Sequence, residues 1–170
     1  MAFILNTATN STVASSIRSI RSRKYEVYVA AVPLRAPRGP PQLLMSTVYS
    51  LNLFDLQHYM VIINSTSASE AVVYDFQPED PEDVFTAVTA LSGKEIPGVV
   101  LTRKLKKLPK RKCWFVGYSE SDAVEGRVHG FNERWDTDLR IGVHDCRNYA
   151  NELVEYLTGE KLVLENLTCN

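Results

Sequence analysis

Apolar runs of β-branched and aromatic residues predict two pairs of β-strands. The pairs are residues 58–64 (HYMVIIN) with 70–76 (EAVVYDF), and residues 99–105 (VVLTRKL) with 112–118 (KCWFVGY). Each run is rich in β-branched and aromatic side chains, and a short polar interval separates its two halves, as in a hairpin. We therefore expect two antiparallel hairpins.

The chain ahead of the first hairpin predicts one more strand and then a break. Residues 25–34 (YEVYVAAVPL) carry β-branched and aromatic residues at alternating positions and predict a strand. Residues 35–42 (RAPRGPPQ) form a Pro/Gly loop that cannot pair in a sheet. Residues 43–54 are apolar and fit either a strand or a short helix.

Helical spacing of apolar residues predicts two helices between residues 80 and 135. In the first, Asp80 caps the helix, Pro81 occupies its first position and Gly93 ends it. Its expected apolar stripe consists of Val84, Phe85, Val88 and Leu91. The second, over residues 121–135, is weaker because it contains two glycines. Its apolar positions are Val124, Val128, Phe131 and Trp135.

The clearest helical pattern begins at Cys146. Asp145 is positioned to cap this helix and Gly159 to end it. One face is apolar and consists of Cys146, Tyr149, Ala150, Leu153, Val154 and Leu157. The thiol is thus expected in the first turn, pointing toward the core.

These elements indicate an α+β fold in which antiparallel β-hairpins pack with two or three helices. The chain has 170 residues, 45% of them hydrophobic, which suits one domain over residues 25–170. Residues 1–24 are predicted to be a disordered tail or an organelle transit peptide, because they lack acidic residues and are rich in Ser, Thr and Arg. The predicted location is therefore the chloroplast, with the mitochondrion or cytoplasm as alternatives. No apolar run is long enough for a transmembrane segment.

Three cysteines, Cys113, Cys146 and Cys169, are widely spaced and suit a reducing compartment. Their spacing gives no metal motif, so no cofactor is predicted. Cys146 has two interpretations. A thiol in the first turn of a helix is placed for a nucleophile, if a base stands opposite. Alternatively, it is a small apolar residue that packs on the helix face.

Three histidines are candidate bases. His144 is too close in sequence to face Cys146 from the same helix, and His129 has the setting of a surface residue. His58 begins the most β-rich run of the chain. A histidine at the end of a central strand can point at the start of a helix packed on that sheet. His58 is accordingly the candidate base.

The segments HYMVIIN, EAVVYDFQP and HDCRNYANELVEYLTGEKL together resemble the circularly permuted papain-like fold. In that fold the histidine comes first, on a hairpin strand, and the cysteine last, at the start of a helix. The resemblance is greatest to the PPPDE (DeSI-type) isopeptidases and more distant to the lecithin:retinol acyltransferase-like family. Asp145 departs from the usual pattern by replacing an Asn before the cysteine.

The resemblance implies a thiol hydrolase in which Cys146 and His58 form a catalytic dyad. Its substrate would be a protein or acyl group joined through an amide, isopeptide or thioester bond. The sequence assigns no third catalytic residue. Gln57 and Asn148 have suitable chemistry for orienting the histidine or stabilising an oxyanion, and His144 could tune Cys146.

Basic residues are concentrated between residues 103 and 112. They are candidates for contact with an anionic partner, either a lipid headgroup, an acidic protein or RNA, or else they form a solvated hairpin tip. An alternative function is therefore a catalytically inactive plastid binding or assembly protein that docks through this segment. The basic residues are Arg103, Lys104, Lys106, Lys107, Lys110, Arg111 and Lys112.

Overall fold

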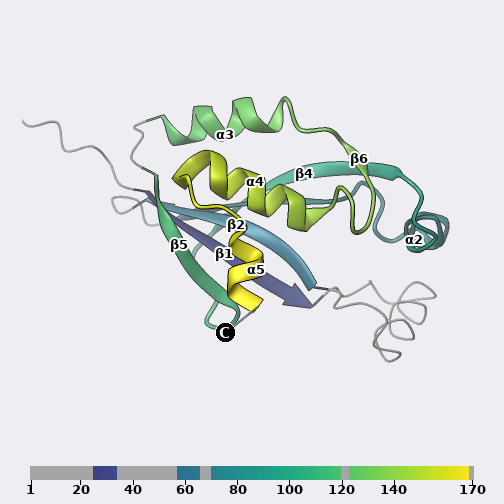
Figure 1. Cartoon of the computed structure of the whole chain (residues 1–170), viewed down its shortest axis with the longest axis horizontal. Coiled ribbons are helices and arrows are strands. Elements are labelled where there is room, and N and C mark those ends of the chain that lie inside the picture. The colour runs from purple at the N-terminus through teal and green to yellow at the C-terminus, as the bar shows by residue number, and fades with distance from the viewer. Residues whose placement is uncertain (1–24, 34–56, 66–69, 120–122, 169–170) are drawn as a thin grey trace, which may run out of the picture.

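The computed structural model describes residues 25–33, 57–65, 70–119 and 123–168 (Figure 1). The predicted tail or transit peptide, the Pro/Gly loop and the undecided segment 43–54 lie outside these ranges, as does Cys169. Those expectations, and the location that depends on them, stay predictions.

Six strands form one antiparallel sheet in the order β5-β1-β2-β3-β4-β6. The predicted strand at residues 25–34 is confirmed, and it lies inside the sheet between β2 and β5. The first predicted hairpin is also confirmed, since β2 pairs directly with β3. The strands are β1 (Tyr25–Pro33), β2 (Gln57–Ser65), β3 (Ala71–Pro78), β4 (Ile96–Leu105), β5 (Cys113–Ser119) and β6 (Asp138–Leu139).

Four helices occupy the described residues: α2 (Val84–Leu91), α3 (Val124–Asn132), α4 (Cys146–Thr158) and α5 (Val163–Thr168). Helix α4 contacts β1, β2, β3 and β5 as well as α3 and α5, and Figure 1 shows it lying over the sheet. The predicted apolar stripe of α4 is confirmed, because five of its residues are buried. These are Tyr149, Ala150, Leu153, Val154 and Leu157.

The fold is therefore α+β, as predicted, with one more helix than the two or three expected. The short α5 and the two-residue strand β6 were not predicted. The weak helix is shorter than expected, although its Val124 and Val128 are buried. No helix in the described ranges is long and apolar enough to cross a membrane.

The predicted start of α2 is wrong. The cap is Asp83, whose carboxylate accepts hydrogen bonds from the Thr86 backbone N–H at 2.8 Å and from its hydroxyl at 2.9 Å. The predicted stripe also fails to pack, since Phe85 is 81% exposed and Val88 is 50% exposed. Periodicity alone did not reveal that α2 packs mainly through other positions.

The predicted second hairpin is wrong as well. β4 pairs with β3 and β6, whereas β5 pairs with β1 near the other edge of the sheet. The connection between them, residues 106–112, must therefore pass across β3, β2 and β1. We call this connection the basic strap.

The basic strap accounts for a second, smaller core. Leu105, Leu108 and Cys113, in and beside the strap, pack against buried residues that are distinct from the core under α4. The strap also bonds directly to the sheet, because the Lys112 carbonyl accepts the Ala31 N–H at 2.9 Å. The buried residues of this second core are Ala30, Met60, Ile62, Ala71 and Val73.

Candidate active site

The local sequence fixes Cys146 at the first position of α4. Asp145 is the cap, as predicted, and its carboxylate accepts the Arg147 N–H at 2.8 Å. The side chain of Asn148 accepts the Asp145 N–H at 3.0 Å, which completes a capping box. The helix start is therefore held from both directions, and the position of the thiol is defined with it.

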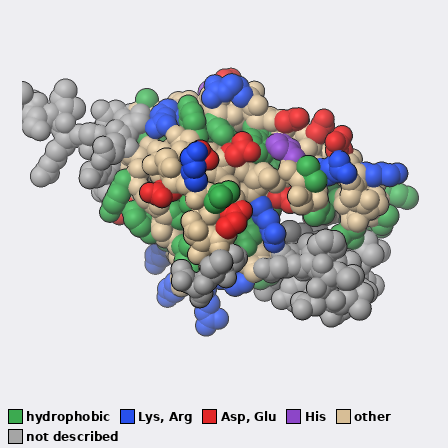
Figure 2. Space-filling model, viewed as in Figure 1, with side chains coloured by type: hydrophobic (Ala, Val, Ile, Leu, Met, Phe, Trp, Pro, Cys, Tyr) green, Lys and Arg blue, Asp and Glu red, His purple; other side chains and the backbone are tan. Residues whose placement is uncertain are grey.

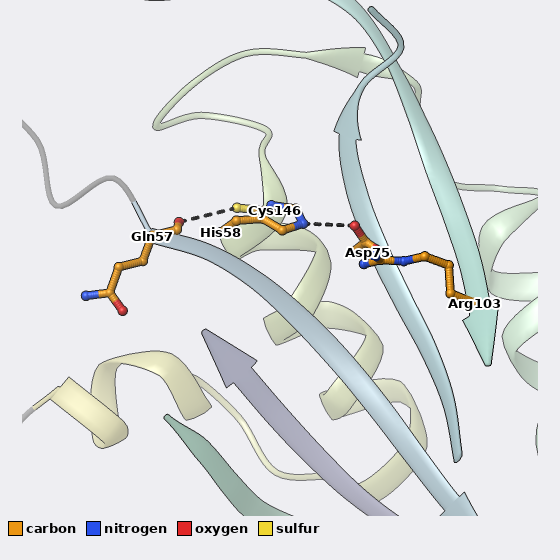
Figure 3. Close-up of polar contacts among 5 residues, drawn as sticks. All are labelled: Gln57, His58, Asp75, Arg103 and Cys146. Carbon is orange, nitrogen blue, oxygen red and sulfur yellow. Dashed lines mark hydrogen bonds and ion pairs between the residues drawn. The ribbon is translucent and has the colours of Figure 1, made fainter. Parts of the chain in front are cut away.

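Strand β2 brings His58 to this helix start. The imidazole lies beside the Cys146 side chain in Figure 3, where the thiol contributes to raising the pKa of His58. The Cys146 sulfur also lies 3.9 Å from the Gln57 carbonyl oxygen, which belongs to the residue before the histidine. The two residues singled out from the sequence thus meet at the point where β2 begins.

A buried carboxylate holds the far side of the imidazole. His58 Nε2 lies 2.9 Å from Asp75 Oδ2, and the other carboxylate oxygen accepts a hydrogen bond from Arg103 at 2.8 Å (Figure 3). The side chain of Asp75 is 1% exposed, that of His58 is 14% exposed and that of Arg103 is 52% exposed. A chain of contacts therefore runs from the thiol through β2 and β3 to β4.

These contacts shift both titrating groups toward their charged forms. Burial lowers the pKa of His58, but hydrogen bonds and charges from Asp75 and Cys146 outweigh it and raise the pKa to about 9. Burial raises the pKa of Asp75. The hydrogen bond and charge of His58, and then those of Arg103, outweigh burial and lower this pKa below its usual value. The arrangement favours an imidazolium beside a carboxylate.

The hydrogen bond to Asp75 occupies one of the two nitrogens of the imidazole. Because Asp75 holds Nε2, Nδ1 is the nitrogen left to take the proton of the Cys146 thiol. The bond to Asp75 also fixes the orientation of the ring. Chemically, this is a nucleophile, a base and a group that orients the base.

The remaining candidates from the sequence lie elsewhere. His144 stacks on Trp135 with ring centroids 4.4 Å apart, and its Nε2 bonds to the Asp136 carbonyl at 2.9 Å. His129, on α3, is 75% exposed and pairs with Glu133 at the end of that helix.

Neither predicted orienting group takes that position. The Asn148 side chain belongs to the capping box, and the Gln57 side chain points away from the thiol in Figure 3. Cys113 packs in the second core.

Sequence reasoning missed Asp75 and misassigned Arg103. Asp75 lies within the strand EAVVYDF, and Arg103 was grouped with the basic segment. A signal for Asp75 was present, because a carboxylate inside an otherwise apolar strand has to be paired if it is buried. A histidine on the neighbouring strand of the same hairpin was available as its partner.

In comparisons with known proteins, no family model, no curated protein and no solved structure matches this chain. The case for a function therefore rests on the site itself.

Proposed function

We propose that this protein is a cysteine hydrolase that cleaves an amide, isopeptide or thioester bond with Cys146 as nucleophile and His58 as base. Asp75 orients the base. The observation that carries the proposal is the position of the imidazole, which lies beside the thiol and bonds to a buried carboxylate. A cysteine with only a packing role would not require a histidine oriented by a buried carboxylate beside it.

In the first half of the reaction, the neutral form of His58 takes the proton of the thiol through Nδ1, and the Cys146 sulfur attacks the substrate carbonyl carbon. The bond from that carbon to nitrogen or sulfur then breaks, and the imidazolium returns its proton to the leaving amine or thiol. In the second half, His58 removes a proton from water, which attacks the thioester on Cys146. The acid leaves, and the thiol is restored.

The first turn of α4 offers a donor for the oxyanion formed in both halves. The Arg147 and Asn148 N–H groups both bond to the Asp145 carboxylate. By contrast, the Cys146 N–H has no acceptor among the described residues. Its place at the start of the helix suits stabilisation of negative charge on the substrate oxygen.

The order of the residues along the chain adds support. The histidine on a hairpin strand precedes a cysteine at a helix start, as in the circularly permuted papain-like fold of the PPPDE isopeptidases. We propose that fold and relationship for this chain. Under this proposal the substrate is a protein or acyl group attached through a carbonyl, and the replacement of Asn by Asp145 serves the helix cap.

Selective alkylation tests the site directly. In a Cys113→Ser, Cys169→Ser background, iodoacetamide should label Cys146 rapidly near neutral pH. His58→Gln should slow the labelling by about 100-fold or more, the usual contribution of a general base. His129→Gln is the matched control, since this exposed histidine pairs with Glu133, and it should leave the rate unchanged.

Equal labelling rates in His58→Gln and His129→Gln would contradict the proposal. Turnover of a thioester and of an isopeptide substrate by the parent, with none by Cys146→Ser, would support it further. If Cys146 labels slowly and neither substrate turns over, the alternative of an inactive binding protein is favoured.

A further inference from the structure

The basic strap has two unlike sides. Its apolar residue Leu108 is half-buried and packs with the second core, together with the flanking Leu105 and Cys113. The sheet also holds the strap at its end, through the Ala31 N–H and the Lys112 carbonyl. The strap is thus anchored on the sheet instead of extending as a free loop.

The other side of the strap is cationic. Its five basic side chains are all exposed, and none forms an ion pair with another residue in the described ranges. Figure 2 shows blue side chains along the lower margin of the molecule, next to the position of β5 in Figure 1. The five residues are Lys106, Lys107, Lys110, Arg111 and Lys112.

Exposed aromatic rings continue this surface. Phe115 on β5 is 47% exposed and Tyr118 is 48% exposed. Phe115 contacts Tyr28, which packs against the same second core as the strap, with centroids 5.5 Å apart. The cations and the aromatic rings therefore belong to the same side of the sheet.

We propose that this surface, the basic strap with Phe115 and Tyr118, docks on an anionic lipid membrane. A group of four to eight cations attracts negatively charged headgroups, and Phe and Tyr side chains are suited to the interface between headgroups and acyl chains. The cations are concentrated locally in the strap, although the whole chain has a net charge of −1.

The ring geometry argues against RNA as the occupant. Bases stack on open aromatic faces. Here the Phe115 ring packs edge to face against two neighbours, Tyr28 at an interplanar angle of 72° and Tyr118 at 61°. This cluster therefore presents a small apolar surface and little open ring face on which a base could stack.

Vesicle binding tests the proposal. The full chain should bind phosphatidylcholine vesicles that contain phosphatidylserine, fail to bind phosphatidylcholine alone, and be released by high salt. Lys106→Gln with Lys107→Gln should weaken binding roughly 30-fold, from about 1 kcal/mol per cation at the surface and 1.4 kcal/mol per factor of ten. Phe115→Ala should weaken it by a smaller factor.

The matched control is Lys94→Gln with Lys161→Gln, which removes the same charge from two exposed positions outside the strap. This variant should bind within about two-fold of the parent, and circular dichroism should show that both double variants are folded. Equal losses in the two double variants would overturn the proposal, as would no binding to phosphatidylserine vesicles. Tighter binding to single-stranded RNA or to polyglutamate than to these vesicles would also overturn it.

Discussion

The two faces of the sheet carry similar alternating apolar residues but have very different covers. One face packs under helices and holds the large core that includes Phe76, Tyr149 and Leu153. The other face holds five buried residues, all with aliphatic side chains, under a single short strap. A helix brings several buried side chains to the sheet in each turn, whereas the strap brings Leu108. We therefore expect the helix face to supply most of the stability and the strap face to tolerate change.

The largest expected effect lies under α4. Leu153 is completely buried, so Leu153→Ala should lower the free energy of unfolding by about 3–5 kcal/mol, through lost burial and the cavity left behind. Urea denaturation measures this change. The control is Phe85→Ala on the exposed side of α2, which should stay within about 0.5 kcal/mol of the parent. A loss below about 1.5 kcal/mol for Leu153→Ala would contradict the assignment of the main core.

The next effect concerns pH and the site beside α4. The pKa of His58 is about 9 in the folded protein and about 6.5 when unfolded, so protonation of His58 stabilises the fold. This contribution is complete below about pH 6.5 and is lost as the pH rises through about 9. It amounts to about 3 kcal/mol at 1.36 kcal/mol per pH unit.

Denaturation across that range should show this decline in the parent and in Leu108→Ala, and should not show it in His58→Gln. If Leu108→Ala removed the decline as well, the protonation of His58 would depend on the packing of the strap. The pKa of Asp75 affects stability at low pH. Its pKa is lowered, so its stabilising contribution is present above about pH 4 and is lost as the pH falls through its folded value.

A smaller effect is expected on the strap face. Leu108 is half-buried, so Leu108→Ala should lower the free energy of unfolding by about 1–2 kcal/mol, well below the Leu153→Ala loss. The same urea titration gives both values. Losses of equal size would show that the strap contributes as much as the helix and would remove the proposed difference between the faces.

The smallest effect tests the bend at the end of the strap. Lys112 has a φ of 50°, in the left-handed region that is unfavourable for β-branched residues. Lys112→Val should therefore be less stable than Lys112→Gly by about 1 kcal/mol, although both remove the same charge. A thermal-melt comparison of the two variants checks this. Equal melting temperatures would mean that the backbone at Lys112 is not held in this conformation.

Sequence patterns predicted the local elements better than their arrangement. The α4 stripe, its Asp145 cap and its Gly159 end are all local features, and the structure confirms them. The prediction that β4 pairs with β5 was wrong, because a short polar interval between two strands suggests a hairpin whether or not the strands are neighbours in the sheet. Only the register with β1 shows that residues 106–112 cross the sheet.

The site was predictable in part for the same reason. His58 and Cys146 stand at the ends of recognisable elements, so the order of those elements suggested their meeting. Asp75 and Arg103 are brought to the site by strand register, which the hydrophobic pattern does not encode. The basic segment was visible as a charge cluster, but its division into Arg103 at the site and five free cations on the strap requires the fold.

The central position of β1 has a consequence for folding during synthesis. Tyr25 pairs with Ser65 on one side and with Ser119 on the other. The edge of β1 that pairs with β5 therefore stays unpaired until most of the chain has left the ribosome. Such long-range pairing is slow and leaves the chain prone to aggregation. α4 follows later still. Cys146 can therefore meet His58 only after most of the chain has been made.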